Sequence, residues 1–405
     1  MRKNRKLLII VLVNIILFSI PIFNEKVNAK DNITYTESTE EDTEKLKEAY
    51  EESEQDLEGL YKYINKSKND TEIMKDLNPE EYVKSYIVNG KGNISMKTLE
   101  KTLLSLIFKE VSSVLKIAMS IIVIAILSSL LKNMQDAFSN QGISEVAFYA
   151  CYSILIVLLS KSFLVAIDVA KDVIYSITDF MAVVLPVLVT MIGLSGGVVE
   201  STMMDPIVME AALIIPRIYT TFIIPLILIG FALQFANNLS KEHKITNLCN
   251  MVKKITLWSQ GFIITVFIAI LSIRGITSST LDAVAMKTTK FAIDNFVPIV
   301  GKSFSDAISS VAGYSLIIKN AVSGVGLLVI VLLITYPIIK IVSMIWIYRF
   351  SAALVEPISD KRMTSAISAA SDSLVMLLSC VLSLSLMFFI LIGIMASASK
   401  FVVGA

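Results

Sequence analysis

The last long apolar block of the chain, residues 374–397, reads LVMLLSCVLSLSLMFFILIGIMAS and contains no charged residue. An α-helix needs about 20 apolar residues to cross the roughly 30 Å hydrocarbon core of a bilayer, so this block is long enough to span it. Further blocks of similar character precede it. They cover residues 111–131, 146–167, 173–194, 211–236, 255–273 and 321–346. The sequence therefore predicts an all-α, polytopic membrane protein with about seven transmembrane helices.

The composition of the 405 residues agrees with membrane residence: 55% are hydrophobic and 18% are charged. Ordinary soluble domains are about 45–50% apolar and about 25% charged. The net charge is +1, and no basic run with interleaved aromatic residues is present, so nucleic-acid binding is not expected. The three cysteines have neither the spacing of a zinc site nor that of a disulfide framework.

Residue patterns that could perform chemistry are missing from the sequence. His243 is the one histidine, so a two-histidine metal site is not available. The run Gly301-Lys302-Ser303 resembles the end of a phosphate-binding P-loop, but Phe296 stands where that motif requires a glycine. We therefore predict no catalytic residue, no cofactor and no metal, and we do not expect an enzyme.

The N-terminus has the order of a secretory signal peptide, which we place at residues 1–29. Four basic residues lie within the first six positions, and an apolar run from Leu7 to Phe23 follows. Val27-Asn28-Ala29 then provides a small-x-small cleavage pattern. The alternative is an uncleaved first helix. Either interpretation places the following segment outside the cytoplasm.

Residues 30–105 are polar and are predicted to form a small, helical extracytoplasmic segment, with a multi-span membrane domain over 106–405. Apolar residues of this segment recur at helical spacings. They are Leu46, Tyr50, Leu57, Tyr61 and Ile64. The run Asn78-Pro79-Glu80-Glu81 is typical of a helix start. A solvated spacer and a partner-binding module both remain open for this segment.

The stretch 274–320 is too apolar for a simple loop and too polar to span a bilayer. We interpret it as two short amphipathic or re-entrant helices, broken near Pro298 and Gly301, before the sixth span. Seven crossings would leave the C-terminus in the cytoplasm. If one of the first four blocks does not cross, the basic loop 237–254 moves to the cytoplasmic side instead. The positive-inside rule does not choose between these topologies, because the totals of basic residues nearly cancel.

Charged residues inside apolar blocks are candidates for the lining of a conduit, because a charge at mid-bilayer usually faces a partner or water. The candidates are Lys161, Asp179 and Arg217. Lys161 and Asp179 fall in neighbouring blocks and are predicted to pair. Small residues four apart, as in Ser365/Ala369 and Gly393/Ser397, favour close helix packing within the chain or in a homo-oligomer.

The stretch from Phe296 to Gly326 is the most specific part of the sequence. It contains FVPIVGKSFSDA from Phe296 and VAGYSLIIKNAVSGVG from Val311. Over most of its length, and most closely here, the chain resembles the stage III sporulation protein AE family of endospore-forming bacteria. The resemblance implies a structural role for the motif residues. These are Phe296, Pro298, Gly301, Ser303, Asp306, Gly313, Lys319, Asn320, Gly324 and Gly326.

The resemblance also implies a function that periodicity does not show. Proteins of this family are part of a channel or secretion-like complex in the mother-cell membrane that surrounds the forespore. The implied partners are an ATPase-like cytoplasmic subunit, ring-forming proteins of the intermembrane space and other membrane subunits, within a lipid bilayer. The expected function is thus a membrane core subunit that links the two cells and supports forespore development. The alternative is a stand-alone small-molecule permease.

Overall fold

The computed structural model describes residues 50, 57–68, 72–75, 77–89, 92, 96–138, 141–239, 245–296 and 301–398. Every regular element among these residues is helical, which confirms the all-α prediction. A short N-terminal part contains a helix over residues 57–68, the 3₁₀ turn η1 (Glu72–Met74) and α3 (Pro79–Asn89). The long helices that follow are α4 (Met96–Phe138), α5 (Gln141–Leu194), α6 (Val198–Ile218), α7 (Ile224–Leu239), α8 (Thr246–Phe296), α9 (Gly301–Val355) and α10 (Lys361–Ser397).

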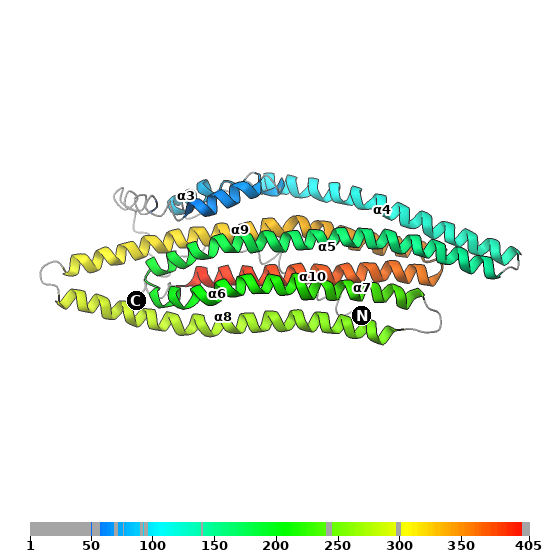
Figure 1. Cartoon of the computed structure of the whole chain (residues 1–405). Coiled ribbons are helices and arrows are strands. Elements are labelled where there is room, and N and C mark those ends of the chain that lie inside the picture. Colours follow the sequence, from blue (N-terminus) through cyan, green and yellow to red (C-terminus); the bar gives the residue numbers. More distant parts are fainter. Residues whose placement is uncertain are drawn as a thin grey trace.

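The long helices form an antiparallel bundle in which consecutive helices run in opposite directions, except that α6 continues into α7 (Figure 1). Helix α4 lies at one edge beside α5 and α9, and α8 lies at the other edge beside α6 and α7. Helix α10 runs between these two groups and is the most buried of the candidate spans. The apolar core is therefore centred on α10 and on the faces of α5 and α9 that contact it.

The described residues contain six helices that are long and apolar enough to cross a membrane, so the prediction of about seven spans is not confirmed. The difference lies in the blocks 146–167 and 173–194, which are parts of the single 54-residue helix α5. The charged residues between them suggested a turn, but Asp168-Val169-Ala170-Lys171-Asp172 contains no glycine or proline that would end a helix. At 1.5 Å per residue α5 is about 81 Å long, more than twice the thickness of the hydrocarbon core.

Exposed charged side chains lie in the middle of α5. They are Lys161, Asp168, Asp172 and Asp179. Exposed apolar side chains lie on both sides of this region, as at Val157 and Leu194. The charges therefore interrupt the apolar surface of α5 without ending the helix.

The stretch 274–320 does not form short, separate helices, and this part of the prediction is wrong. Residues 274–296 continue α8 without a break, and residues 301–320 are the first part of α9. The expected break near Pro298 and Gly301 falls at residues 297–300, which lie outside the described part. Together the two extensions form a helical hairpin that projects beyond the rest of the bundle at one end (Figure 1).

The junction between α6 and α7 is a π-helical turn, η2, at Tyr219–Ile223. Pro225 has no backbone N–H and its ring would clash with the carbonyl of residue 221 in a regular α-helix. The wider π turn accommodates this proline without interrupting the helix. Thr220 Oγ1 donates to the carbonyl oxygen of Pro216 at 3.1 Å, which gives that carbonyl a local partner.

Candidate functional site

One stretch of α9, residues 319–326, contacts α3, α5 and the end of α10, and we define it as the α9 junction. It lies within the motif that the sequence singled out. Four of the ten motif residues fall in it: Lys319, Asn320, Gly324 and Gly326. The side chains that meet here connect the polar N-terminal part of the chain to the membrane helices.

Tyr82 of α3 fills the space beside two glycines. A Cβ atom at Gly324 would lie 3.3 Å from Tyr82 Oη, and one at Gly92 would lie 1.9 Å from Cε2 of the same ring. The Tyr82 side chain is buried, and burial raises the pKa of Tyr82 to about 12, with a further contribution from Tyr86. The phenol is therefore neutral at physiological pH. Only glycine at positions 92 and 324 leaves room for this ring without movement of the neighbouring groups.

A second tyrosine fixes the N-terminal part to α5. Tyr63 Oη donates to the backbone carbonyl oxygen of Ser176 at 2.7 Å. Its ring also packs against Phe180, with ring centroids 5.8 Å apart. Leu57, Leu60 and Ile64 on the same helix are fully buried. The N-terminal part thus packs against two separate helices of the bundle, α5 and α9.

Lys319 is fully buried at the α9 junction, where its Nζ donates to the backbone carbonyl oxygen of Ala398, just after α10. A buried ammonium requires hydrogen-bond partners, since its desolvation is otherwise costly. Gly326 allows α5, α9 and α10 to approach one another: a Cβ there would lie 3.2 Å from Ile392 Cδ1 and 3.7 Å from Val184 Cγ2. The junction therefore positions the C-terminal end of α10 as well as α3.

The other motif residues lie elsewhere or outside the described part. Gly313 lies in the same helix, and a Cβ atom there would meet nothing within 4 Å, so it makes no comparable close contact. Phe296 ends α8 and Gly301 begins α9. Pro298 lies outside the described residues, and so do the side chains of Phe296, Ser303 and Asp306.

The predicted ion pair between Lys161 and Asp179 is wrong. Both residues belong to α5, and the 18 positions between them correspond to about 27 Å along the helix axis. The prediction assumed two neighbouring helices with a loop between them. Both side chains are exposed, as is that of Arg217 in the last turn of α6. The structure does not bring the three proposed conduit residues together, since Lys161 and Asp179 are this far apart on one helix.

Several partly buried polar contacts were not anticipated from the sequence. Arg349 of α9 forms an ion pair with Asp372 of α10 at 3.2 Å. Ser379 Oγ donates to Gln260 Oε1 of α8 at 2.7 Å. Asp282 of α8 accepts a hydrogen bond from the backbone N–H of Val199 at 2.7 Å, in the first turn of α6. Each contact joins residues from different helices. None of these residues has a local sequence pattern that distinguishes it from other polar residues of apolar helices, so no sequence signal predicts the contacts.

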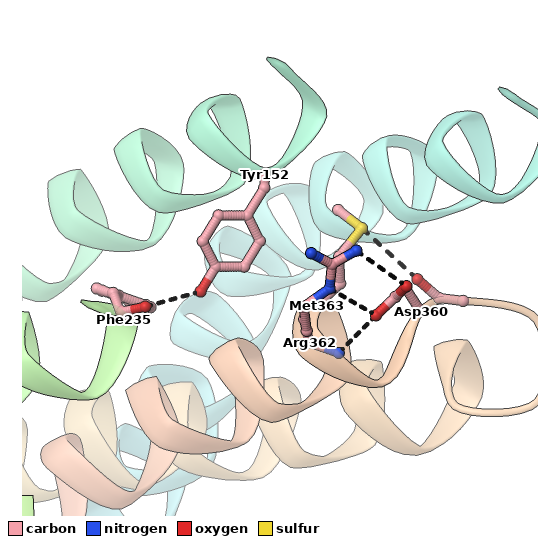
Figure 2. Close-up of polar contacts among 6 residues, drawn as sticks. Tyr152, Phe235, Asp360, Arg362 and Met363 are labelled. Atoms are coloured by element: carbon pink, nitrogen blue, oxygen red, sulfur yellow. Dashed lines mark hydrogen bonds and ion pairs between the residues drawn. The ribbon is translucent and has the colours of Figure 1, made fainter. Parts of the chain in front are cut away.

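The opposite end of the bundle has its own polar cluster, at the turn between α9 and α10 (Figure 2). Asp360 caps α10 by accepting from the backbone N–H of Arg362 at 2.9 Å, and it also binds the Arg362 side chain. The Arg362 guanidinium lies 3.5 Å from the centroid of the Phe148 ring. Tyr152 Oη donates to the carbonyl oxygen of Phe235 at 3.1 Å. These contacts hold α5, α7 and α10 together, and the aspartate before a helix start was the one available sequence signal.

Comparison with known proteins identifies the family. The model of the stage III sporulation protein AE family matches residues 77–399. The chain belongs to this family. The match begins just before α3 and ends just after Ala398, so the whole α9 junction lies within it. Membership gives the chain a role in sporulation, and the apolar helices make it a membrane protein.

A curated relative supports the same identification. The chain is 28% identical over 313 residues to the stage III sporulation protein AE of Bacillus subtilis (strain 168). The aligned region covers 77% of this chain and 78% of the relative. No solved structure matches the chain.

Proposed function

We propose that this protein is a non-catalytic membrane core subunit of a channel or secretion-like complex that links the mother cell to the forespore. It resides in the mother-cell membrane around the forespore and is needed for forespore development. Family membership over residues 77–399 supports the sporulation role. The observation that favours a scaffold is the α9 junction, where the polar N-terminal part is packed against the membrane helices through Tyr82 and Tyr63.

The arrangement offers contact surfaces on both sides of a membrane. The α8–α9 hairpin projects at one end of the bundle, and α3 lies beside α9 toward the same end, where ring-forming proteins of the intermembrane space would bind (Figure 1). The α7–α8 and α9–α10 connections lie at the other end, where an ATPase-like cytoplasmic subunit would bind. Six crossings would put the N-terminal part and Ala398 on the same side, in agreement with their common contacts at the α9 junction.

Deletion of the gene in the sporulating host tests this proposal. We expect forespores that lose volume and late gene expression, and a low yield of heat-resistant spores. Complementation should succeed with Tyr82→Phe and fail or weaken with Tyr82→Ala, because only the second empties the space beside Gly324. Normal spores from the deletion strain would refute the proposal.

The permease alternative has its own test. Its support in the sequence was the expected broken helices and the Lys161–Asp179 pair. Helix α5 keeps the two residues of that pair about 27 Å apart. Purified protein in liposomes should move no small solute by itself if the chain is a subunit of a larger complex. Solute movement without any partner would favour the permease.

A further inference from the structure

Helix α10 has a continuous half-exposed stripe although most of its surface is buried. The exposed positions recur every three or four residues and therefore lie on one face of the helix. We define the α10 seam as eight of these positions: Asp372, Val375, Ser379, Ser383, Leu386, Ile390, Gly393 and Ser397. The partly exposed residues Leu382, Phe389, Ile394 and Ala396 border it. Five of the eight seam residues are Asp, Ser or Gly.

Gln260 of α8 is an incompletely satisfied polar group beside the seam. Its side chain is 4% exposed, and its Oε1 accepts a hydrogen bond from Ser379 Oγ at 2.7 Å. Its Nε2 has no hydrogen-bond partner among the described residues. Both helices are candidate membrane spans, and lipid chains contain no acceptor for this donor. The amide therefore calls for a ligand that provides an acceptor.

The remaining polar groups of the seam are already paired within the chain. Asp372 binds Arg349 at 3.2 Å, which neutralises its charge. Ser383 Oγ donates to Tyr219 Oη at 3.0 Å. Val375, Leu386 and Ile390 alternate with the small residues on the same stripe. A surface that is neutral, partly apolar and short of one acceptor suits a protein segment better than a column of water.

The spacing of the small residues identifies the kind of segment. Ser379 and Ser383 are four residues apart, as are Gly393 and Ser397, and this spacing allows a second helix to approach closely. Gln260 of α8 and Arg349 of α9 both contact α10 along the seam. The seam is therefore recessed between two neighbouring helices. A second copy of α10, recessed in the same way, would not reach it.

We propose that the α10 seam binds one transmembrane helix of a different membrane protein. That helix presents small residues to Ser379 and Ser383 and a hydrogen-bond acceptor to the Gln260 amide, whose buried Nε2 reaches the acceptor by rotation of the side chain. The inference rests on the proposed function, because it assigns one subunit contact of the complex to a single helix face. Its test measures the helix contact and not sporulation, so this inference and the proposed function can be refuted separately.

A photo-reactive benzophenone amino acid at Leu386 tests the contact in membranes of sporulating cells. Leu228 of α7 is the matched control, since both leucines are 38% exposed and both lie in candidate spans. We expect the probe at Leu386 to form an adduct with another membrane protein, and mass spectrometry to locate the bond in an apolar segment of that protein. The probe at Leu228 should react with lipid only.

Variants of the seam show whether the adduct depends on the proposed contacts. Gln260→Met keeps the volume but removes the donor, and it should reduce the adduct roughly three- to tenfold, as expected for one interhelical hydrogen bond. Ser383→Leu fills the seam and should abolish the adduct. Both variants must reach the membrane in normal amount, with unchanged lipid reaction at Leu228. An adduct with a second copy of this chain, lipid adducts alone, or an adduct that ignores both substitutions would overturn the proposal.

Discussion

Replacement of Tyr82 by alanine should release the N-terminal part of the chain from α9. The ring is buried between Gly92 and Gly324, and removal of a buried aromatic side chain typically costs about 3–5 kcal/mol. Since the ring lies at an interface and not in the deepest core, we expect about 3 kcal/mol. That is on the order of a 100-fold increase in the population of the undocked state. Hydrogen exchange of the α3 backbone amides in detergent micelles measures this population directly.

A double-mutant cycle with Gly324 isolates the contact itself. The first atom that a Cβ at Gly324 meets is Tyr82 Oη at 3.3 Å, and the next is Cε1 at 3.7 Å, an ordinary contact distance. Tyr82→Phe removes Oη and should change exchange little by itself. Gly324→Ala should weaken docking in the wild-type chain and much less in the Tyr82→Phe chain, with a coupling of about 1 kcal/mol. Unchanged α3 exchange in Tyr82→Ala, or strictly additive single effects, would refute this account of the junction.

Further predictions concern the stability of α9 and the pH dependence of docking. Gly326→Val should lower the melting temperature by overpacking against Ile392, at a cost of about 1–3 kcal/mol, whereas Gly313→Ala, with open space around it, should be neutral or gain up to about 1 kcal/mol. Lys319→Met should lower the free energy of unfolding by about 1–3 kcal/mol, because the hydrogen bond to the Ala398 carbonyl is lost. It should also make the end of α10 more accessible to carboxypeptidase. Equal digestion of the variant and the wild type would contradict this prediction. Because the folded pKa of Tyr82 is about 12 and its ordinary value is 10, docking should be constant below pH 10 and weaken between pH 10 and 12. Tyrosine absorbance titration should show this late-titrating group in the wild type and not in Tyr82→Phe.

Local patterns predicted much of the fold. Apolar blocks of sufficient length gave helices at each expected place, and the helical spacing of Leu57, Tyr61 and Ile64 corresponds to side chains that are buried. These features depend on neighbours within one or two turns, which a single sequence contains. The prediction that residues 146–167 and 173–194 form two separate helices was wrong. Charges at Asp168 and Asp172 lower the local hydropathy but do not end a helix, so hydropathy predicted a turn where α5 continues.

Contacts between distant residues could not be predicted in the same way. Gly324 was selected as part of a motif, but nothing in the sequence connects it with Tyr82, which lies more than 240 positions earlier (324 − 82). Gln260 resembles any other polar residue in an apolar block until Ser379 is placed beside it. The candidate site consists of such pairs. The sequence could therefore indicate which stretch of α9 is special, and the structure shows what that stretch contacts.

Accessibility of single cysteines is the most direct test of the central claim that the N-terminal part and the end of α10 lie together on one side of six crossings. The test uses a chain in which the three native cysteines, Cys151, Cys249 and Cys380, are replaced. A single cysteine is then placed at one of four exposed positions: Lys62, Asn247, Lys361 or Ser397. The variants are expressed in vegetative cells, in which the extracytoplasmic side of the cell membrane faces the medium. A membrane-impermeant maleimide applied to protoplasts of these cells should label Lys62→Cys and Ser397→Cys. It should label Asn247→Cys and Lys361→Cys only after permeabilisation. Labelling of Ser397→Cys only after permeabilisation, with Lys62→Cys labelled before it, would show an odd number of crossings and contradict the account.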